Sequence, residues 1–279
     1  MSSQTNAAPK PGAKGANYHK ECTGQALETV KAHSRPVGVT LFGAAFCPFV
    51  HRVWIAFEFM GIPYQYREVD PYAKPADLLE LNPKGLVPAL RLEDGKGLGE
   101  STVILEYLEE AFSLASEGKV PSLLPPLSDA YGRALSRLAC DKINRNLVPA
   151  FYRYLQAQEP EAQARGAKEF LSALEGFTDE MDPKGPFWGG EKLGLPDVMA
   201  APWCFRANCV LRHFRGFEIE SMLQGTRYGQ WQEAVFSHPA FKATTSTEEL
   251  YLDSYARYAE NRPNTSQVAN AINSGRGLP

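Results

Sequence analysis

Residues 40–54 constrain the fold of this chain more than any other part of its sequence. An apolar run at residues 37–42 leads into a Gly-Ala loop, which ends at Cys47 and Pro48. Proline is favoured at the first position of a helix, where its missing N–H has no intrahelical partner to lose. Apolar side chains then recur at three- and four-residue intervals, the spacing of a buried helical face: Val50, Val53, Trp54 and Phe57. The segment therefore predicts a strand, a short loop and a helix that begins just after Cys47.

The predicted position of Cys47 favours a reactive role for its thiol. The first turn of a helix presents unpaired backbone N–H groups and the positive end of the helix dipole, and both stabilise a thiolate. Cysteines in such places have pKa values of about 3.5–7.5, against about 8.5 for free cysteine. We therefore predict that Cys47 is a nucleophile with a low pKa. The alternative is a buried cysteine with a structural role only.

The overall composition argues against several classes of function. The net charge of the 279 residues is −3, which offers no basic surface for nucleic acid, and no apolar run approaches the ~18 residues of a membrane span. The first 20 residues lack the apolar core of a secretory signal. The five cysteines are widely spaced and form no C-x-x-C pair, so we expect no metal site, no disulfide framework and a reducing, cytoplasmic location.

The order of predicted elements indicates two domains after an N-terminal tail at residues 1–36. Residues 37–115 alternate strands and helices as a β-α-β unit followed by a β-β-α unit, which predicts an α/β domain with a small mixed sheet. Residues 116–128 are rich in Gly and Pro and are interpreted as a linker. Residues 129–260 are predicted to be all-helical, with one long helix kinked or broken at Pro149 and an apolar core helix at residues 198–210. Residues 261–279 are expected to form an irregular C-terminal tail.

Two further features add binding chemistry to the α/β domain. Pro88 lies at a strand start although proline removes a ladder donor. A cis peptide bond before Pro88 would turn the N–H and C=O of Val87 outward, where they can pair with an extended peptide; an edge-strand proline without a partner is the alternative. Glu100 and Ser101 stand at a predicted helix N-terminus, where amides and a hydroxyl can hold a carboxylate and Glu100 an ammonium group. Alone, this pair would be only a helix cap.

Together these features describe a cleft for a small zwitterionic peptide that carries a thiol. The combination resembles the glutathione site of the cytosolic glutathione transferases. The sequence Cys47-Pro48-Phe49-Val50-x-Arg52 is similar to that of the omega class, whose nucleophile is cysteine, and residues 255–279 are similar to the ends of fungal omega-like members. The resemblance implies a thioredoxin-like glutathione-binding domain at residues 37–115, an all-helical domain at residues 129–260 and a homodimer. It also implies a weaker cap on the core helix, because Gly194 replaces the family's Ser or Thr.

The resemblance implies a role for each residue of the expected glutathione site. Val87 would pair through its backbone with the cysteinyl unit, and Glu100 and Ser101 would hold the γ-glutamyl end. Lys74 would bind the glycyl carboxylate, and Phe49 would line the cleft near the sulfur. The site is thus expected to comprise catalytic Cys47 with Phe49, Lys74, Val87, Pro88, Glu100 and Ser101.

The acceptor pocket would be built by the helical domain. By position in the family pattern Trp231 would face it, although core packing is the alternative for this side chain. Phe151 and Tyr152, which follow Pro149, are weaker candidates. His51 lies one helical turn past Cys47 and could be a base, but a solvated histidine is the more common case.

The chemistry expected of this site is monothiol exchange, because Val50 occupies the position of the second cysteine in a C-x-x-C motif. A cysteine thiolate attacks sulfur and expels another thiolate through a mixed disulfide. With glutathione as co-substrate, the expected activity is reduction of disulfides, of dehydroascorbate or of glutathionylated aromatic ketones. The alternatives are a conventional glutathione-conjugating transferase and a non-catalytic ligand-binding or regulatory protein on the same fold.

Overall fold

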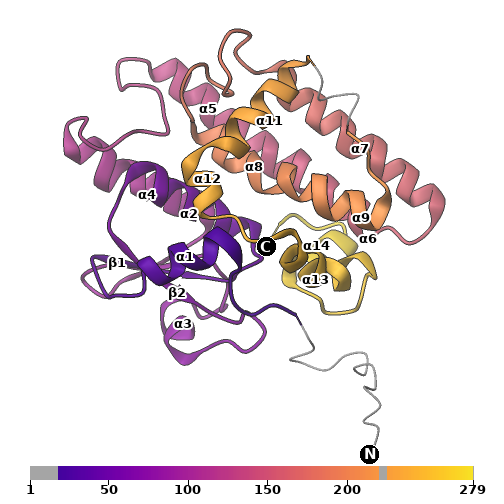
Figure 1. The fold of residues 1–279 in the computed structure, drawn as a ribbon, viewed down its shortest axis with the longest axis horizontal. Helices are drawn as coiled ribbons and strands as arrows, with labels where there is room; N and C mark the ends of the chain where they lie inside the picture. Colours follow the sequence, from indigo (N-terminus) through magenta and orange to yellow (C-terminus); the bar gives the residue numbers. More distant parts are fainter. Residues whose placement is uncertain (1–17, 220–224, 279) are drawn as a thin grey trace, which may run out of the picture.

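The computed structural model describes residues 18–219 and 225–278, and every structural statement below concerns this part of the chain. It has an α/β domain followed by a larger, helical domain (Figure 1). The α/β domain is built on a four-stranded sheet with the strand order β2-β1-β3-β4. The inner strand β1 (Val39–Gly43) and the edge strand β2 (Tyr64–Glu68) are parallel. The strands β3 (Ala89–Arg91) and β4 (Gly97–Gly99) are antiparallel to their neighbours, so the predicted mixed sheet is confirmed.

Helices cover both faces of this sheet, because β1 is buried on both sides. Leu41 faces the main core with α2, whereas Phe42 packs with Leu78 of α3 in a smaller cluster. In Figure 1, α2 and α4 lie between the sheet and the helical domain, and α3 lies on the far side of the sheet. The helices of this domain are α1 (Gly24–Ala32), α2 (Pro48–Met60), α3 (Ala76–Leu81) and α4 (Ser101–Leu108), which continues as a π-helical turn, η1 (Glu109–Ser113), and a 3-10 turn, η2 (Leu114–Ser116).

Residues 18–36 are packed against the domain, contrary to the prediction of a tail. The Tyr18 hydroxyl donates to Asp70 at 2.7 Å, and the Cys22 N–H donates to Glu68 at 2.8 Å. Cys22 and Ala26 are buried, which holds the short helix α1 in place. Residues 1–17 of the predicted tail lie outside the described residues.

The second domain is all-helical, as predicted. The core helix α8 runs through its centre in Figure 1, and every residue of α8 except Phe205 is buried. Its helices are α5 (Ala130–Lys142), η3 (Ile143–Leu147), α6 (Val148–Gln156), α7 (Pro160–Asp179), α8 (Leu195–Arg206), η4 (Ala207–Leu211), α9 (Arg212–Arg215), α11 (Arg227–Ser237), α12 (Pro239–Ala243), α13 (Glu248–Ala259) and α14 (Gln267–Asn273).

Two predictions for this domain are wrong. The long helix is not broken at Pro149, because the π-helical turn η3 directly precedes α6 and widens the helix where proline cannot donate a hydrogen bond. The C-terminal segment is not irregular, because α14 forms there. The Ser266 hydroxyl caps α14 by accepting a hydrogen bond from the Ala269 N–H at 2.9 Å.

The N-terminus of α8 is held by the buried carboxylate of Asp197. Gly194 occupies the cap position and supplies no side chain, as the sequence predicts. Asp197 accepts hydrogen bonds from the Gly194 N–H at 2.7 Å, the Trp188 N–H at 2.8 Å and the Trp231 Nε1–H at 2.7 Å. Burial raises the pKa of Asp197 to about 6, although these donors act to lower it. One carboxylate therefore joins α8, the preceding loop and α11.

Asp197→Ala should destabilise the protein by roughly 3 kcal/mol or more, since it leaves two buried donors and the half-buried Gly194 N–H without an acceptor and each such loss costs about 1–3 kcal/mol. Urea unfolding followed by circular dichroism measures the change. The matched control is Asp129→Ala at the exposed start of α5, where the carboxylate accepts only from the Gly132 N–H. Loss of that cap should cost about 1 kcal/mol. Equal losses in the two variants would contradict the role assigned to Asp197.

Candidate active site

Two adjoining cavities lie where the α/β domain meets α6, α13 and α14. The larger has a volume of about 300 Å³ and is lined by Cys47, Phe49, Lys74, Val87 and Tyr152, among others. The smaller, of about 70 Å³, is lined by Phe49, Leu86, Val87, Pro88, Glu100, Ser101 and Val268. We call the two cavities together the cleft. Because they share Phe49, Val87 and Val268, the cleft brings together all seven residues expected for the catalytic and glutathione sites.

Cys47 stands at the N-cap of α2, with Pro48 as the first helical residue, as the sequence predicts. Its backbone is fixed on both sides, because its N–H donates to the Ala44 carbonyl at 3.0 Å and its C=O accepts from the His51 N–H at 3.1 Å. The Cys47 Sγ lies 3.8 Å from the Val87 carbonyl oxygen. The sulfur is therefore held at the wall of the cleft, beside the backbone expected to bind a cysteinyl residue.

Two sets of interactions shift the pKa of the Cys47 thiol in opposite directions. Burial raises the pKa of the Cys47 thiol above its ordinary value, while the Phe49 and Val50 amides and the guanidinium groups of Arg206 and Arg52 act to lower it. The prediction that the helix N-terminus sets a low pKa is therefore wrong in its net direction. The helix amides act as expected, but removal of the sulfur from water outweighs them.

The backbone of Val87 is free to bind a ligand. The peptide bond between Val87 and Pro88 is cis, as predicted, and β3 begins only at Ala89. Among the described residues, neither the N–H nor the C=O of Val87 has a backbone hydrogen-bond partner. The N–H remains available to pair with an extended peptide in the cleft, and the C=O can do so by exchanging the hydrogen bond that it accepts from the Cys47 thiol.

Lys74 lies over a glycine at the rim of the larger cavity. The Lys74 Nζ donates to the Lys84 carbonyl at 2.7 Å, which holds the Lys74 side chain against the backbone beside Gly85. Gly85 beneath it has a φ of +60°, and a Cβ there would lie only 2.4 Å from Lys74 Cδ. The sequence therefore needs glycine at residue 85 to place the ammonium group at the cleft.

Glu100 and Ser101 lie at the start of α4 and line the smaller cavity. Ser101 is buried, whereas Glu100 is exposed. Glu100 has a φ of +66°, a region that residues other than glycine rarely adopt, and its carbonyl accepts from the Ile104 N–H at 2.9 Å. Backbone conformations of this kind cost roughly 1–3 kcal/mol and gather at binding sites.

Three expectations for the helical domain meet different outcomes. Tyr152 lines the larger cavity, but Phe151 and Trp231 line neither cavity. Both are fully buried: Phe151 packs edge to face against Phe170, and Trp231 is bonded to Asp197. Trp231 therefore packs in the core, which is the alternative considered for this side chain. Neither Phe151 nor Trp231 lines the cleft.

His51 is buried, and it is neither a solvated side chain nor a base in the cleft. Its Nε2 lies 3.1 Å from Thr244 Oγ1, and its Nδ1 lies 3.3 Å from Arg206 Nη1. Burial, with a smaller contribution from Arg206, holds the pKa of His51 well below its usual range. The imidazole therefore links α2 to the helical domain.

Sequence reasoning missed most of the wall opposite Cys47. This wall is formed by tyrosines and by the segment that carries α14. Tyr152 and Tyr258 have ring centroids 5.8 Å apart, and Tyr255 and Tyr258 have centroids 5.3 Å apart. The three-residue spacing of Tyr255 and Tyr258 and the capping serine at residue 266 were the available signals. The residues concerned are Tyr72, Tyr255, Tyr258, Asn264, Thr265, Ser266, Gln267, Val268 and Asn270.

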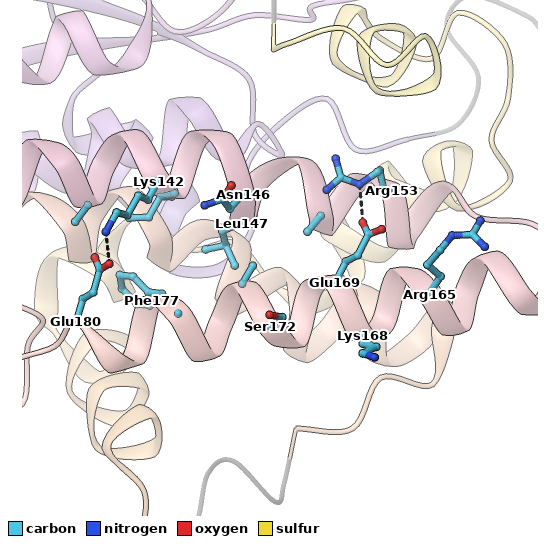
Figure 2. A pocket seen from close by; sticks show the side chains of 15 residues that line it. Lys142, Asn146, Leu147, Arg153, Arg165, Lys168, Glu169, Ser172, Phe177 and Glu180 are labelled. Atoms are coloured by element: carbon cyan, nitrogen blue, oxygen red, sulfur yellow. Dashed lines mark hydrogen bonds and ion pairs between the residues drawn. The ribbon is translucent and has the colours of Figure 1, made fainter.

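A separate groove of about 570 Å³ runs between α7 and the continuous helix α5–η3–α6 (Figure 2). Figure 2 shows two ion pairs across it, Lys142 with Glu180 and Arg153 with Glu169. No cysteine lines this groove. The groove therefore presents no thiol to a ligand. Within the described residues, no cluster of three His, Cys, Asp or Glu side chains could hold a metal ion, and no helix is long and apolar enough to cross a membrane.

Comparison with known proteins agrees with this geometry. Residues 46–111 match the N-terminal domain of glutathione S-transferases, and residues 160–234 match their C-terminal domain. The chain is 31% identical to the pyrimidodiazepine synthase of Drosophila melanogaster, over 80% of this chain and 87% of that protein. The chain belongs to the glutathione transferase family.

Within this family, the chain is similar to omega-class transferases and to a dehydroascorbate reductase. It is 38% identical to glutathione transferase Omega 3C from Trametes versicolor, with a TM-score of 0.77, over 86% of this chain and 98% of that one. It is 25% identical to the dehydroascorbate reductase of Chlamydomonas reinhardtii, with a TM-score of 0.63, over 80% of this chain and 100% of that one. The omega-like class expected from residues 47–52 is confirmed by these likenesses.

Proposed function

We propose that this protein is an omega-like glutathione transferase that acts mainly as a glutathione-dependent thiol transferase, with Cys47 as its nucleophile. The observation that carries the proposal is the thiol at the N-terminus of α2, which donates to the Val87 carbonyl at 3.8 Å. In the proposed complex, the Val87 backbone pairs with the cysteinyl unit of glutathione. Glu100 and Ser101 hold its γ-glutamyl end, Lys74 its glycyl carboxylate, and Phe49 lies near its sulfur.

The proposed reaction has two thiol–disulfide exchanges. The Cys47 thiolate attacks the glutathione sulfur of a mixed disulfide, a Cys47–glutathione disulfide forms, and the substrate leaves as a thiolate that takes up a proton. The thiolate of a second glutathione attacks the bound glutathione sulfur, which releases oxidised glutathione and restores the Cys47 thiolate. Val50 provides no second thiol at the C-x-x-C position.

Conjugation of electrophiles is the second candidate activity, supported by the family to which the chain belongs. It is disfavoured because a cysteine does not stabilise the glutathione thiolate with a hydroxyl hydrogen bond. The relatives support reduction, since one of them is a dehydroascorbate reductase. The five free cysteines support a reducing compartment such as the cytoplasm.

Cys47→Ser should abolish reduction of a glutathione mixed disulfide and give a measurable conjugating activity. A serine hydroxyl cannot form the mixed disulfide, but it can hydrogen-bond the thiolate of glutathione. Turnover of both kinds of substrate, compared in the wild type and the variant, measures the exchange of activities. Cys209→Ser, at a buried thiol outside the cleft, is the control and should keep disulfide reduction. Reduction that survives in Cys47→Ser would show that another cysteine is the nucleophile.

The acceptor substrate is proposed to bind against Tyr152 and α14. Asn270→Phe should raise the KM for a bulky aromatic acceptor by roughly tenfold, because the larger side chain enters the larger cavity, and Asn270 does not line the smaller cavity beside Glu100 and Ser101. The KM for a small mixed disulfide should change less. Ile272→Phe changes the same helix outside the cleft and should leave both values as in the wild type. Equal changes in the two variants would contradict the placement of the acceptor.

We further propose that the protein is a homodimer. The exposed face of α5 carries a stripe of large apolar side chains at helical spacing, Tyr131, Leu135 and Leu138, with exposed fractions of 75%, 38% and 48%. An ion pair between Arg137 and Glu106 at 2.7 Å ties this helix to α4. Contiguous apolar surface of this kind is typical of protein interfaces.

Leu135→Glu should convert the proposed dimer into a monomer, because it places a charge at the centre of the apolar stripe on α5. Light scattering coupled to gel filtration measures the mass directly. Leu79→Glu, at an equally exposed leucine on α3, should leave the mass unchanged. A monomeric wild type, or a dimeric Leu135→Glu variant, would contradict this interface.

A further inference from the structure

Two buried arginines stand behind Cys47 without a carboxylate partner among the described residues. Arg52 of α2 is 1% exposed, and Arg206 of α8 is 0% exposed. Arg52 Nε donates to the Met199 carbonyl at 2.9 Å. Arg206 donates from Nη1 to the Pro202 carbonyl at 2.9 Å and from Nη2 to the Phe46 carbonyl at 3.0 Å. A buried charge without a counter-charge is costly, so its presence requires a physical reason.

Aromatic rings and carbonyl groups offset part of this cost. The Arg52 guanidinium lies 4.1 Å from the ring centroid of Trp203, and the Arg206 guanidinium lies 4.4 Å from that of Tyr251. Each side chain nevertheless retains an unused donor. Within the described part of the chain, Arg52 Nη2 and Arg206 Nε are buried and have no hydrogen-bond partner. The positive charge of the two groups is therefore incompletely compensated.

The ionisable groups that surround the two arginines and Cys47 are thiols, phenols and one imidazole. They come from α2 and its N-cap, from β2 and the loop after it, and from the helical elements α5, α6, η4 and α13. Of these, Cys47 is the thiol that lines the cleft. The groups are Cys47, Cys140, Cys209, Tyr66, Tyr72, Tyr152, Tyr251, Tyr255, Tyr258 and His51.

We infer that Arg52 and Arg206 form a buried cationic pair that stabilises the negative charge on the Cys47 sulfur. Arg206 has a second role as a positioning residue, since its hydrogen bond to the Phe46 carbonyl fixes the peptide that precedes Cys47. The inference rests on the proposed function only in naming Cys47 as the nucleophile. Neither arginine lines the cleft, so both act through Cys47 without touching substrate.

The two guanidinium groups offset part of the effect of burial, which disfavours the thiolate form of Cys47. Burial raises the pKa of Cys47, and Arg206 and Arg52 are the two charged side chains that lower it. In the proposed reaction, the thiolate is consumed when the mixed disulfide forms and reappears when glutathione leaves. A permanent buried cation stabilises that recurring charge without any rearrangement at the moment of reaction.

The first test is the pH dependence of Cys47 alkylation by iodoacetamide, followed by mass spectrometry of the peptide that contains Cys47. Arg52→Gln and Arg206→Gln should each move the midpoint to higher pH by about one unit, which slows alkylation about tenfold at pH 7. Arg206→Lys keeps the charge and should recover most of the shift. Arg133→Gln is the matched control, because Arg133 is also buried and bonds a carbonyl, that of Pro125, away from Cys47. Unchanged midpoints in both glutamine variants would overturn the inference.

The main comparison of the second test leaves both arginines in place, so its outcome does not depend on how the arginine variants fold. Cys47→Asp and Cys47→Asn have similar shapes and similar capping ability, but only aspartate supplies a negative charge. At pH 7 Cys47→Asp should melt at the higher temperature, and Arg206→Gln should reduce the difference in a double-mutant cycle. An aspartate variant that melts at the same or a lower temperature than the asparagine variant would overturn the inference. Neither test requires turnover, so a failure of the proposed activity would be recognised separately in the disulfide assay.

Discussion

The packing of α2 between the sheet and α8 is the constraint on which the rest of the structure depends. Nearly every side chain of α2 is buried, including the polar His51 and Arg52, because the helix has the sheet on one side and the helical domain on the other. The N-terminus of α2 consequently opens at the junction of the two domains. Cys47, which caps that end, can meet one ligand held by the α/β domain and another held by α6, α13 and α14.

The same burial raises the pKa of the Cys47 thiol. A thiol at a helix N-terminus gains from the amides of the first turn, but a thiol removed from water loses the solvation of its charged form. Here the loss exceeds the gain from Phe49 and Val50, which leaves a role for charge supplied from within the core. Arg206 reaches this region from α8, some 160 residues further along the chain. The helical domain thus contributes a positive charge near Cys47 as well as much of the wall opposite it.

The α/β domain and the meeting of the residues expected to bind glutathione could be predicted because their signals are local. Strand and helix periods, Pro48 at a helix start, Pro88 at a strand start and the Glu100–Ser101 pair each depend on a few neighbouring residues, and the structure brings them together in one cleft. The net pKa shift of Cys47 could not be predicted, since it depends on how deeply α8 buries α2. Trp231 was assigned to the acceptor pocket by position alone, whereas its Nε1–H is bonded to the carboxylate of Asp197.

The acceptor wall is the least predictable part of the site because it comes from the end of the chain. Asn, Ser and Gly are frequent in residues 261–279, and this composition suggests an irregular segment, yet Ser266 caps α14 and Gln156 holds that helix through Asn273 at 2.8 Å. Val268 on α14 then faces both cavities. A short helix held by a few polar contacts can change its sequence without disturbing the core of either domain. Substitutions on α14 that face only the larger cavity, such as those at Asn270, can therefore alter the wall opposite Cys47 while the residues of the smaller cavity stay the same.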